Sequence, residues 1–225
     1  MAGATSQELL ARVRSLIGEP SQETWHDDEI YSALTAAQLD LITVRLGDGA
    51  LFEMSEIDEE LLVAGTNVYD LPSDFVRERM VEYKGIYSKR HPARYLKALG
   101  EGTATANAHY TPSETNPFWR IHAGQVVHSV GTVTQANGDA FNLWYISSPA
   151  ADISSTADPE LGTQLQNLLV WFAVSRCMEQ AGEPEIAAAM MAYYKQCCSL
   201  INKRYHDEMP ADRIPGDPTL TYEVK

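Results

Sequence analysis

The chain has 225 residues, of which 44% are hydrophobic and 21% charged, a balance typical of a globular protein. Its 17 basic and 31 acidic residues give a formal net charge of −14, which argues against a protein that grips nucleic acid by its phosphates. We expect one large domain, or one domain with an inserted module, which buries about 70% of the extended chain's surface on folding.

The first 49 residues predict two helices. The first begins at Ser6, carries apolar residues at helical spacing and is stopped by Gly18-Glu19-Pro20. The second opens at Thr24, and acidic residues crowd its first turn, where the helix dipole favours negative charge. It ends near Gly47. Its predicted apolar face consists of Ile30, Leu34, Ala37, Leu41 and Val44.

From about residue 50 the pattern changes to strands. Residues 67–71 alternate as a half-buried strand does, and Pro72 ends it because proline has no N–H for the ladder. Ser73-Asp74 caps the following turn, and a second strand, Arg79–Tyr83, ends at Lys84-Gly85. None of these residues makes a good nucleophile, base or metal ligand, so the stretch indicates architecture rather than chemistry.

The rest of the chain up to residue 150 predicts more strands. Trp119–His122 and Gln125–Ser129 predict a hairpin around an Ala123-Gly124 turn. The other expected elements are a strand at 61–63, a short helix at 92–99, a surface loop at 103–117 and a strand at 142–146.

Helix is predicted again from Asp158-Pro159-Glu160, because Asp suits the cap and Pro suits the first turn. This helix ends near Gly182, and Pro184 starts another. The predicted inner side of the last helix carries Ile186, Met190, Tyr193, Cys197, Leu200 and Ile201.

These elements predict an α+β protein. Helices at both ends of the chain must bury their apolar faces, so we expect an antiparallel helical bundle from residues 1–49 and 151–208. A β-sandwich-like module is inserted at 50–150. The proline-rich residues 209–225 are expected to form an extended C-terminal arm.

The sequence offers little support for a metal-binding or catalytic site. His26-Asp27-Asp28 offers half of a metal site, but capping explains carboxylates in a first helical turn. Cys177, Cys197 and Cys198 are an odd count with two adjacent, so we expect buried free thiols rather than a secreted disulfide framework. We predict no catalytic residue, no metal, no cofactor and no enzyme.

The sequence also predicts a soluble protein made in a cytoplasm. No apolar run reaches the roughly 18 residues of a membrane span. The N-terminus has neither the basic start nor the apolar stretch of a signal peptide.

Several aromatic residues have two interpretations. They could fill the core of the inserted module and thicken the bundle, or they could form contacts between subunits, since Trp and Tyr are common at interface centres. The candidates are Trp119, Trp144, Tyr145 and Trp171.

Four places in this order carry a family resemblance over about residues 6–205. They are the helix closed by Ile17-Gly18-Glu19-Pro20-Ser21, the segment Trp25-His26-Asp27-Asp28-Glu29-Ile30, the segment Tyr69-Asp70-Leu71-Pro72-Ser73-Asp74-Phe75 with its following strand, and a Trp-Tyr strand ending at Pro149 before the helices Pro159–Gln180 and Ala187–Tyr205. Together they resemble the bacteriophage head-to-tail connector (adaptor) proteins, the neck proteins under the portal.

The resemblance implies a structural virion protein, a dodecamer that forms a ring and continues the DNA channel from portal to tail. Its implied partners are its own copies, the portal protein and a tail or stopper protein, with no membrane. DNA passes through the lumen without specific binding, and the acidic balance suits a lumen along which DNA slides.

The C-terminal arm has two interpretations in this setting. Leu220, Tyr222 and Val224 alternate as in a strand. The arm is either an idle disordered end or a segment ordered on assembly, which adds a strand to a neighbour or lodges in the portal.

Three alternatives to the adaptor remain open. They are a tail-completion or tail-attachment protein of the same virion, an unrecognised small soluble cytoplasmic enzyme, and a helical binding module with no viral role. An enzyme would show a deep pocket with clustered ionisable groups. An adaptor would be monomeric or loosely associated alone and would form rings when mixed with portal.

Overall fold

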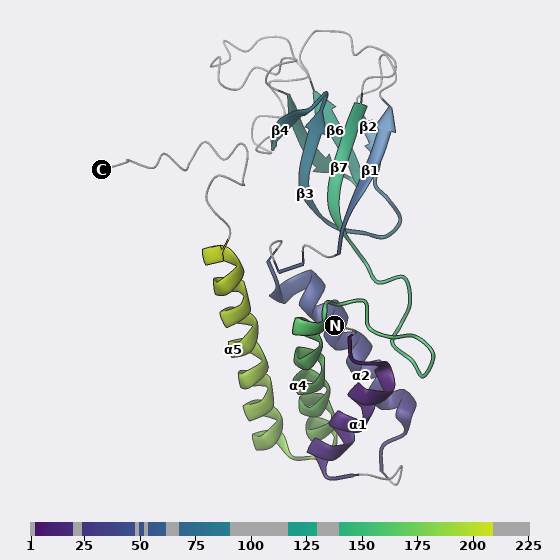
Figure 1. The fold of residues 1–225 in the computed structure, drawn as a ribbon, viewed down its shortest axis with the longest axis vertical. Coiled ribbons are helices and arrows are strands. Elements are labelled where there is room, and N and C mark those ends of the chain that lie inside the picture. Colours follow the sequence, from purple (N-terminus) through teal and green to yellow (C-terminus); the bar gives the residue numbers. More distant parts are fainter. Residues whose placement is uncertain are drawn as a thin grey trace, which may run out of the picture. The chain divides into compact units, whose positions relative to one another are not determined.

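A computed structural model describes residues 3–19, 24–47, 50–51, 54–61, 68–90, 117–129 and 140–208. Within these ranges the protein is a mixed α+β fold with four α-helices and one seven-stranded sheet that curls on itself (Figure 1). The chain divides into two compact units. We call Met1–Ser55 with Ile146–Met209 the helical unit, and the unit that contains Glu56–Tyr145 the β unit.

Helix α1 (Ser6–Ile17) is fixed at both ends by local signals. The Glu8 amide donates to Thr5 Oγ1 at 3.2 Å, and the Thr5 amide donates to the Glu8 carboxylate at 3.1 Å, which forms a capping box. Gly18 follows with a φ of +76°, a left-handed conformation that glycine adopts without strain. The predicted start at Ser6 and stop at Gly18 are confirmed.

Helix α2 (Asp27–Asp40) continues into a π-helical turn, η1 (Leu41–Arg45). Ile30, Leu34 and Leu41 are buried as predicted, but Val44 is 65% exposed, so its place on the apolar face is wrong. The cause is the wider turn, because the Leu46 amide donates to the Leu41 carbonyl five residues back and the later side chains rotate away from helical register.

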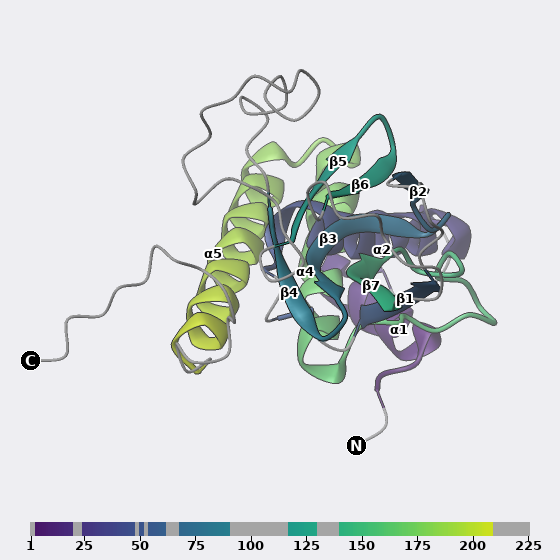
Figure 2. The ribbon, with the colours of Figure 1, turned by 90° about the horizontal axis from the view of Figure 1, so that it is seen from above.

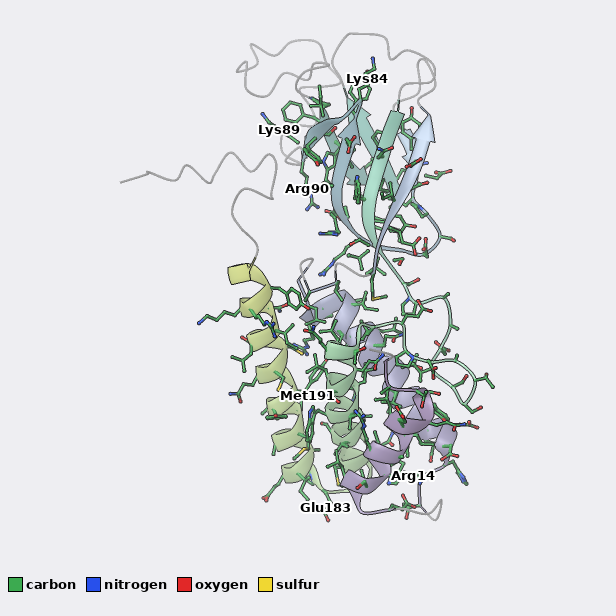
Figure 3. The ribbon with its side chains drawn as sticks, viewed as in Figure 1. Arg14, Lys84, Lys89, Arg90, Glu183 and Met191 are labelled. Atoms are coloured by element: carbon green, nitrogen blue, oxygen red, sulfur yellow. The ribbon has the colours of Figure 1, made fainter. Side chains whose placement is uncertain are left out.

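The first turn of α2 is tied to α1 by charge. Arg14, labelled in Figure 3, reaches from α1 to Asp27 with an Nη2–Oδ1 distance of 2.6 Å, and it also donates to the Trp25 carbonyl. Glu29 accepts the His26 amide at 2.9 Å. These acids therefore have capping and ion-pairing roles in the fold.

Helix α4 (Thr163–Gln180) starts later than the Asp158-Pro159-Glu160 signal predicts. The two carboxylates accept distant amides instead: Asp158 accepts the Ser6 amide at 2.7 Å, and Glu160 accepts the Ala150 amide at 2.8 Å. The predicted start at Asp158 is wrong because these tertiary bonds use the cap groups elsewhere. The predicted end is confirmed, since Gly182 turns the chain with a φ of +81°.

Helix α5 (Pro184–Glu208) begins where predicted and packs on α4. Its buried side is formed by Ala187, Tyr194 and Cys198, whereas Ile186, Tyr193 and Leu200 are exposed. The predicted inner side is therefore wrong for these three residues. The helix carries two apolar stripes side by side, and α4 covers the other one.

Helix α4 lies in the middle of the helical unit. It packs against α1, α2 and α5, and Figure 2 shows it between α2 and α5. Its buried residues therefore point in several directions, as expected for a central helix.

The sheet has the strand order β1-β7-β3-β4-β5-β6-β2. β4 pairs with β5 in parallel, and the other pairings with a described register are antiparallel. The strands are β1 (Ser55–Leu61), β2 (Val68–Asp70), β3 (Phe75–Tyr83), β4 (Ile86–Arg90), β5 (Phe118–His122), β6 (Gln125–Ser129) and β7 (Ala140–Ser147).

Two predicted turns set the register of this sheet. Lys84-Gly85 joins β3 to β4, and Ala123-Gly124 joins β5 to β6, with positive φ at all four residues, as two-residue hairpins require. The Pro72 turn is also present, because the Phe75 amide donates to the Pro72 carbonyl at 3.1 Å. β3 then begins at Phe75, four residues before the predicted strand.

One face of the curled sheet encloses an aromatic core. Leu71, Phe75 and Ile121 pack on its rim. The buried members are Tyr69, Val81, Tyr83, Trp119, Val126, Phe141, Leu143 and Tyr145. The predictions for 62–63, for the helix at 92–99, for the loop at 103–116 and for the C-terminal arm lie outside the described residues.

Candidate interface surfaces

Trp119 lies inside the β unit, where it is 4% exposed. Its Nε1 donates to the Ser88 carbonyl at 3.0 Å, which ties β5 to β4. The Arg90 guanidinium, labelled in Figure 3, lies 5.8 Å from the ring centroid, and Arg90 Nη1 lies 2.7 Å from Glu78 Oε1. Packing and hydrogen bonding account for this tryptophan, and a role between subunits stays a prediction.

Tyr145 has a comparable internal role on β7. Its ring stacks on Phe75 with centroids 5.8 Å apart, and its hydroxyl donates to Asp74 Oδ1 at 3.1 Å. Burial, reinforced by the Asp74 carboxylate, raises the pKa of Tyr145 to about 12. The hydroxyl is therefore a permanent donor at neutral pH, and it links β7 to the turn before β3.

Trp144 points to the opposite face of β7 from Leu143 and Tyr145 and is half-buried. Its indole nitrogen is buried, and among the described residues no acceptor lies within hydrogen-bonding distance. Its side chain is thus less completely accounted for than that of Trp119.

Trp171 on α4 forms the surface aromatic pair of the helical unit. Its ring meets Tyr193 of α5 edge to face with centroids 5.0 Å apart. The next residue on each helix forms a second edge-to-face pair, Phe172 with Tyr194 at 5.4 Å, and this pair is buried. The helix contact therefore carries one aromatic pair inside and one at the surface.

A partly buried polar network orients α5. The Tyr194 hydroxyl donates to Asp40 at 2.7 Å, and the same carboxylate oxygen accepts Arg45 Nε at 3.0 Å. Asn202 Nδ2 donates to the Arg45 carbonyl at 2.6 Å, while Asn202 Oδ1 accepts the Gly47 amide. These bonds fix which side of α5 faces inward, and hence which side faces solvent.

The outward side of α5 is the interface feature that sequence reasoning misassigned. Ile186, Tyr193 and Leu200 are 43%, 47% and 59% exposed, and Met190 and Cys197 between them are half-buried. Their 4-3-4-3 spacing is visible in the sequence, but a spacing shows that residues share a face without showing what covers it.

The cysteines carry no nucleophilic signature. All three are free, and burial raises the pKa of Cys177 and of Cys198 to about 11, so both thiols are protonated at neutral pH. Cys197, predicted to be buried, is half-buried instead.

In the described part of the chain, no His, Cys, Asp or Glu side chains gather as a metal site, and no helix is long and apolar enough to cross a membrane. Leu220, Tyr222 and Val224 lie outside the described residues.

Comparison with protein families identifies the chain. The family model for the SU10 adaptor protein matches residues 4–213, which span both units. The chain belongs to the SU10 adaptor family. A search of curated proteins found no match. The resemblance to head-to-tail adaptors is thereby confirmed. Membership of this family makes the chain a structural phage protein that acts in the virion through contacts with other virion components.

Proposed function

We propose that this protein forms a ring below the portal, continues the DNA channel towards the tail and receives a tail or stopper protein. The observation that carries the proposal is the family match across residues 4–213. The ring, its twelve-fold symmetry and its docking to the portal are the finer part of the proposal. No observation favours the tail-completion or enzyme alternative over it.

Charge supports a channel role. With 31 acidic and 17 basic residues, the protein repels phosphates on average, so DNA inside a ring would slide rather than stick. We expect DNA to pass through the lumen without sequence recognition.

The finer architectural predictions belong to the same proposal. They are a helical bundle from 1–49 and 151–208, a sandwich-like module at 50–150 and an arm at 209–225. The arm would dock through Leu220, Tyr222 and Val224, either as an added strand or within the portal. Trp144 and Trp171 remain candidate contact residues.

The experiment that tests the ring is reconstitution with the portal protein of the same phage. We expect a monomeric or loosely associated chain alone and rings on portal particles in negative-stain images of the mixture. A chain that leaves portal particles unchanged at saturating concentration contradicts the proposal.

A truncation separates the arm from the ring. Deleting 209–225 should weaken portal binding if the arm lodges in the portal, while the folded units keep their thermal stability. Undiminished binding would exclude the portal version and leave strand addition to a neighbouring subunit, which cross-linking within assembled rings would reveal.

A further inference from the structure

Helix α5 carries a second apolar stripe that its own subunit covers only in part. The inner stripe, formed by Ala187, Met191, Tyr194 and Cys198, faces α4, and Figure 3 labels Met191 between the two helices. We call the other set of residues the α5 stripe. It consists of Ile186, Met190, Tyr193, Cys197 and Leu200.

The spacing of the α5 stripe matches a helix-packing seam. Successive members are four, three, four and three residues apart, which is the a/d spacing of a coiled coil. Three of them are exposed to 43–59%, and none is charged. Scattered surface apolar residues need no explanation, but a row of five along one helix marks an interaction surface. The spacing indicates another helix as the partner.

Helix α2 and its π-turn present a second uncharged surface. Between Ile30 and Val44 the sequence has one charged residue, Asp40, and its carboxylate is engaged with Tyr194 and Arg45. A helix face turned to solvent normally carries several charges. We call the outward residues of this segment the α2 face. They are Ser32, Ala36, Leu39, Thr43 and Val44, all exposed.

The two surfaces lie on different flanks of the helical unit. α4 packs against both α2 and α5, and Figures 1 and 2 both show it between them. The α5 stripe is bulky, whereas most of the α2 face is made of short side chains that let another helix approach closely. Two different complementary patches on one chain produce head-to-tail contacts between copies.

Charge identifies the occupant as a second copy. A chain with a net charge of −14 repels its own copies wherever acidic surface meets acidic surface. The α5 stripe and the α2 face contain no charged side chain, so contact between them avoids that repulsion. Leaving them in water would expose Val44, Tyr193 and Leu200, which are 65%, 47% and 59% exposed in the single chain.

We infer that the α5 stripe of one copy packs on the α2 face of the next copy and forms the lateral contact of the assembly. The inference rests on the proposed ring and specifies which surfaces close it. Because the contact is head-to-tail, each copy offers one α5 stripe and one α2 face.

The test uses two charge insertions with matched controls. Ala36→Glu places a carboxylate on the α2 face, and Leu200→Glu places one on the α5 stripe. The controls, Ala188→Glu and Ser199→Glu, put the same charge at exposed α5 positions outside the stripe. All four positions are solvent-exposed, so the monomers should fold, which circular dichroism and thermal melting check.

Sedimentation velocity, followed by imaging on portal particles, gives the result. In each test variant alone, the association constant should fall by about tenfold or more, as expected for a charge at an interface centre. Neither variant alone should close a ring. The controls should behave as the unmodified chain. An equimolar mixture of the two test variants should form dimers and nothing larger, because one intact α5 stripe meets one intact α2 face.

Two results overturn the inference: wild-type assembly by either variant, and a mixture that stays monomeric at a concentration at which the unmodified chain associates. If rings form on the portal regardless of both insertions, the proposed function stands and this contact falls. If the unmodified chain associates through these surfaces yet never decorates the portal, the contact stands and the proposed function falls. If the unmodified chain neither associates nor forms rings, both fall.

Discussion

The β unit and the helical unit treat their aromatic side chains differently. In the β unit, Trp119 and Tyr145 are buried in a core enclosed by a curled sheet. The Trp119 hydrogen bond ties β5 to β4, and the Tyr145 hydrogen bond ties β7 to the turn before β3. In the helical unit, α4 and α5 bury Phe172 with Tyr194 but display Trp171 with Tyr193. A sheet that curls on itself buries its inner face without a partner. A helix packed on one neighbour leaves most of its circumference available.

This difference explains where a partner is needed. The β unit satisfies Trp119 and Tyr145 internally, so substitutions of these two residues should act on folding. The surface of α4 and α5 does not satisfy its aromatic residues in this way, so substitutions there should act on assembly. Paired variants whose stability and association are measured separately test this difference between the two units.

The largest effect is expected at two adjacent tyrosines. Tyr194 is fully buried and bonded to Asp40, so Tyr194→Ala should destabilise the protein by about 3–5 kcal/mol. Tyr193→Ala removes an exposed ring whose contact with Trp171 is worth about 0.5–1.5 kcal/mol, and should mainly reduce self-association. Urea unfolding and sedimentation measure the two effects. If Tyr193→Ala and Tyr194→Ala lowered stability equally, the two sides of α5 would not differ in their roles.

A smaller difference is expected between two tryptophans of the β unit. Trp119→Phe removes the indole hydrogen bond to the Ser88 carbonyl and shrinks a buried ring, so it should cost about 1–3 kcal/mol. Trp144→Phe breaks no hydrogen bond among the described residues and should cost less. Thermal unfolding ranks the two, and portal reconstitution shows whether either changes assembly. If Trp119→Phe left stability unchanged but abolished assembly, the role of Trp119 would be subunit contact rather than core packing.

Local signals in this sequence predicted local structure well. The first helix begins at Ser6 and stops at Gly18 as expected, and Lys84-Gly85 and Ala123-Gly124 turn the chain where predicted. Each of these outcomes depends on residues within a few positions of one another. Neighbouring sequence therefore contains the whole physical cause.

The misses depended on distant partners. Asp158 and Glu160 form a sound helix-start signal, but their carboxylates accept the amides of Ser6 and Ala150. The apolar arc of α5 contains two stripes, and contacts with α4, Asp40 and Arg45 decide which one is buried. The order of four motifs was enough for the family resemblance, which the match over residues 4–213 confirms, whereas the candidate contact surface required the packing.

Alkaline pH should expose the role of Tyr145. Its folded pKa of about 12 lies above the ordinary value of 10.0, so the stabilisation it provides is present below pH 10 and is lost as pH rises towards 12. Tyr145→Phe removes the bond to Asp74, which is worth about 1 kcal/mol at neutral pH. The stability gap between the two proteins should therefore narrow above pH 10. A constant gap in pH-dependent urea unfolding would contradict the assignment.

The smallest effect concerns Asp58 on the edge strand β1. Burial, together with the nearby Asp74 carboxylate, raises the pKa of Asp58 above its ordinary value of 3.8. Its contribution to stability is thus complete below that value and is lost as the side chain ionises at higher pH. Asp58→Asn should therefore stabilise the β unit at neutral pH and change little in acid.

Glu59→Gln on the same exposed strand is the matched control, and it should leave stability unchanged at both pH values. If Asp58→Asn instead destabilised the protein at neutral pH, ionised Asp58 would have a favourable contact. Repulsion between Asp58 and Asp74 would then not lower the stability of the β unit.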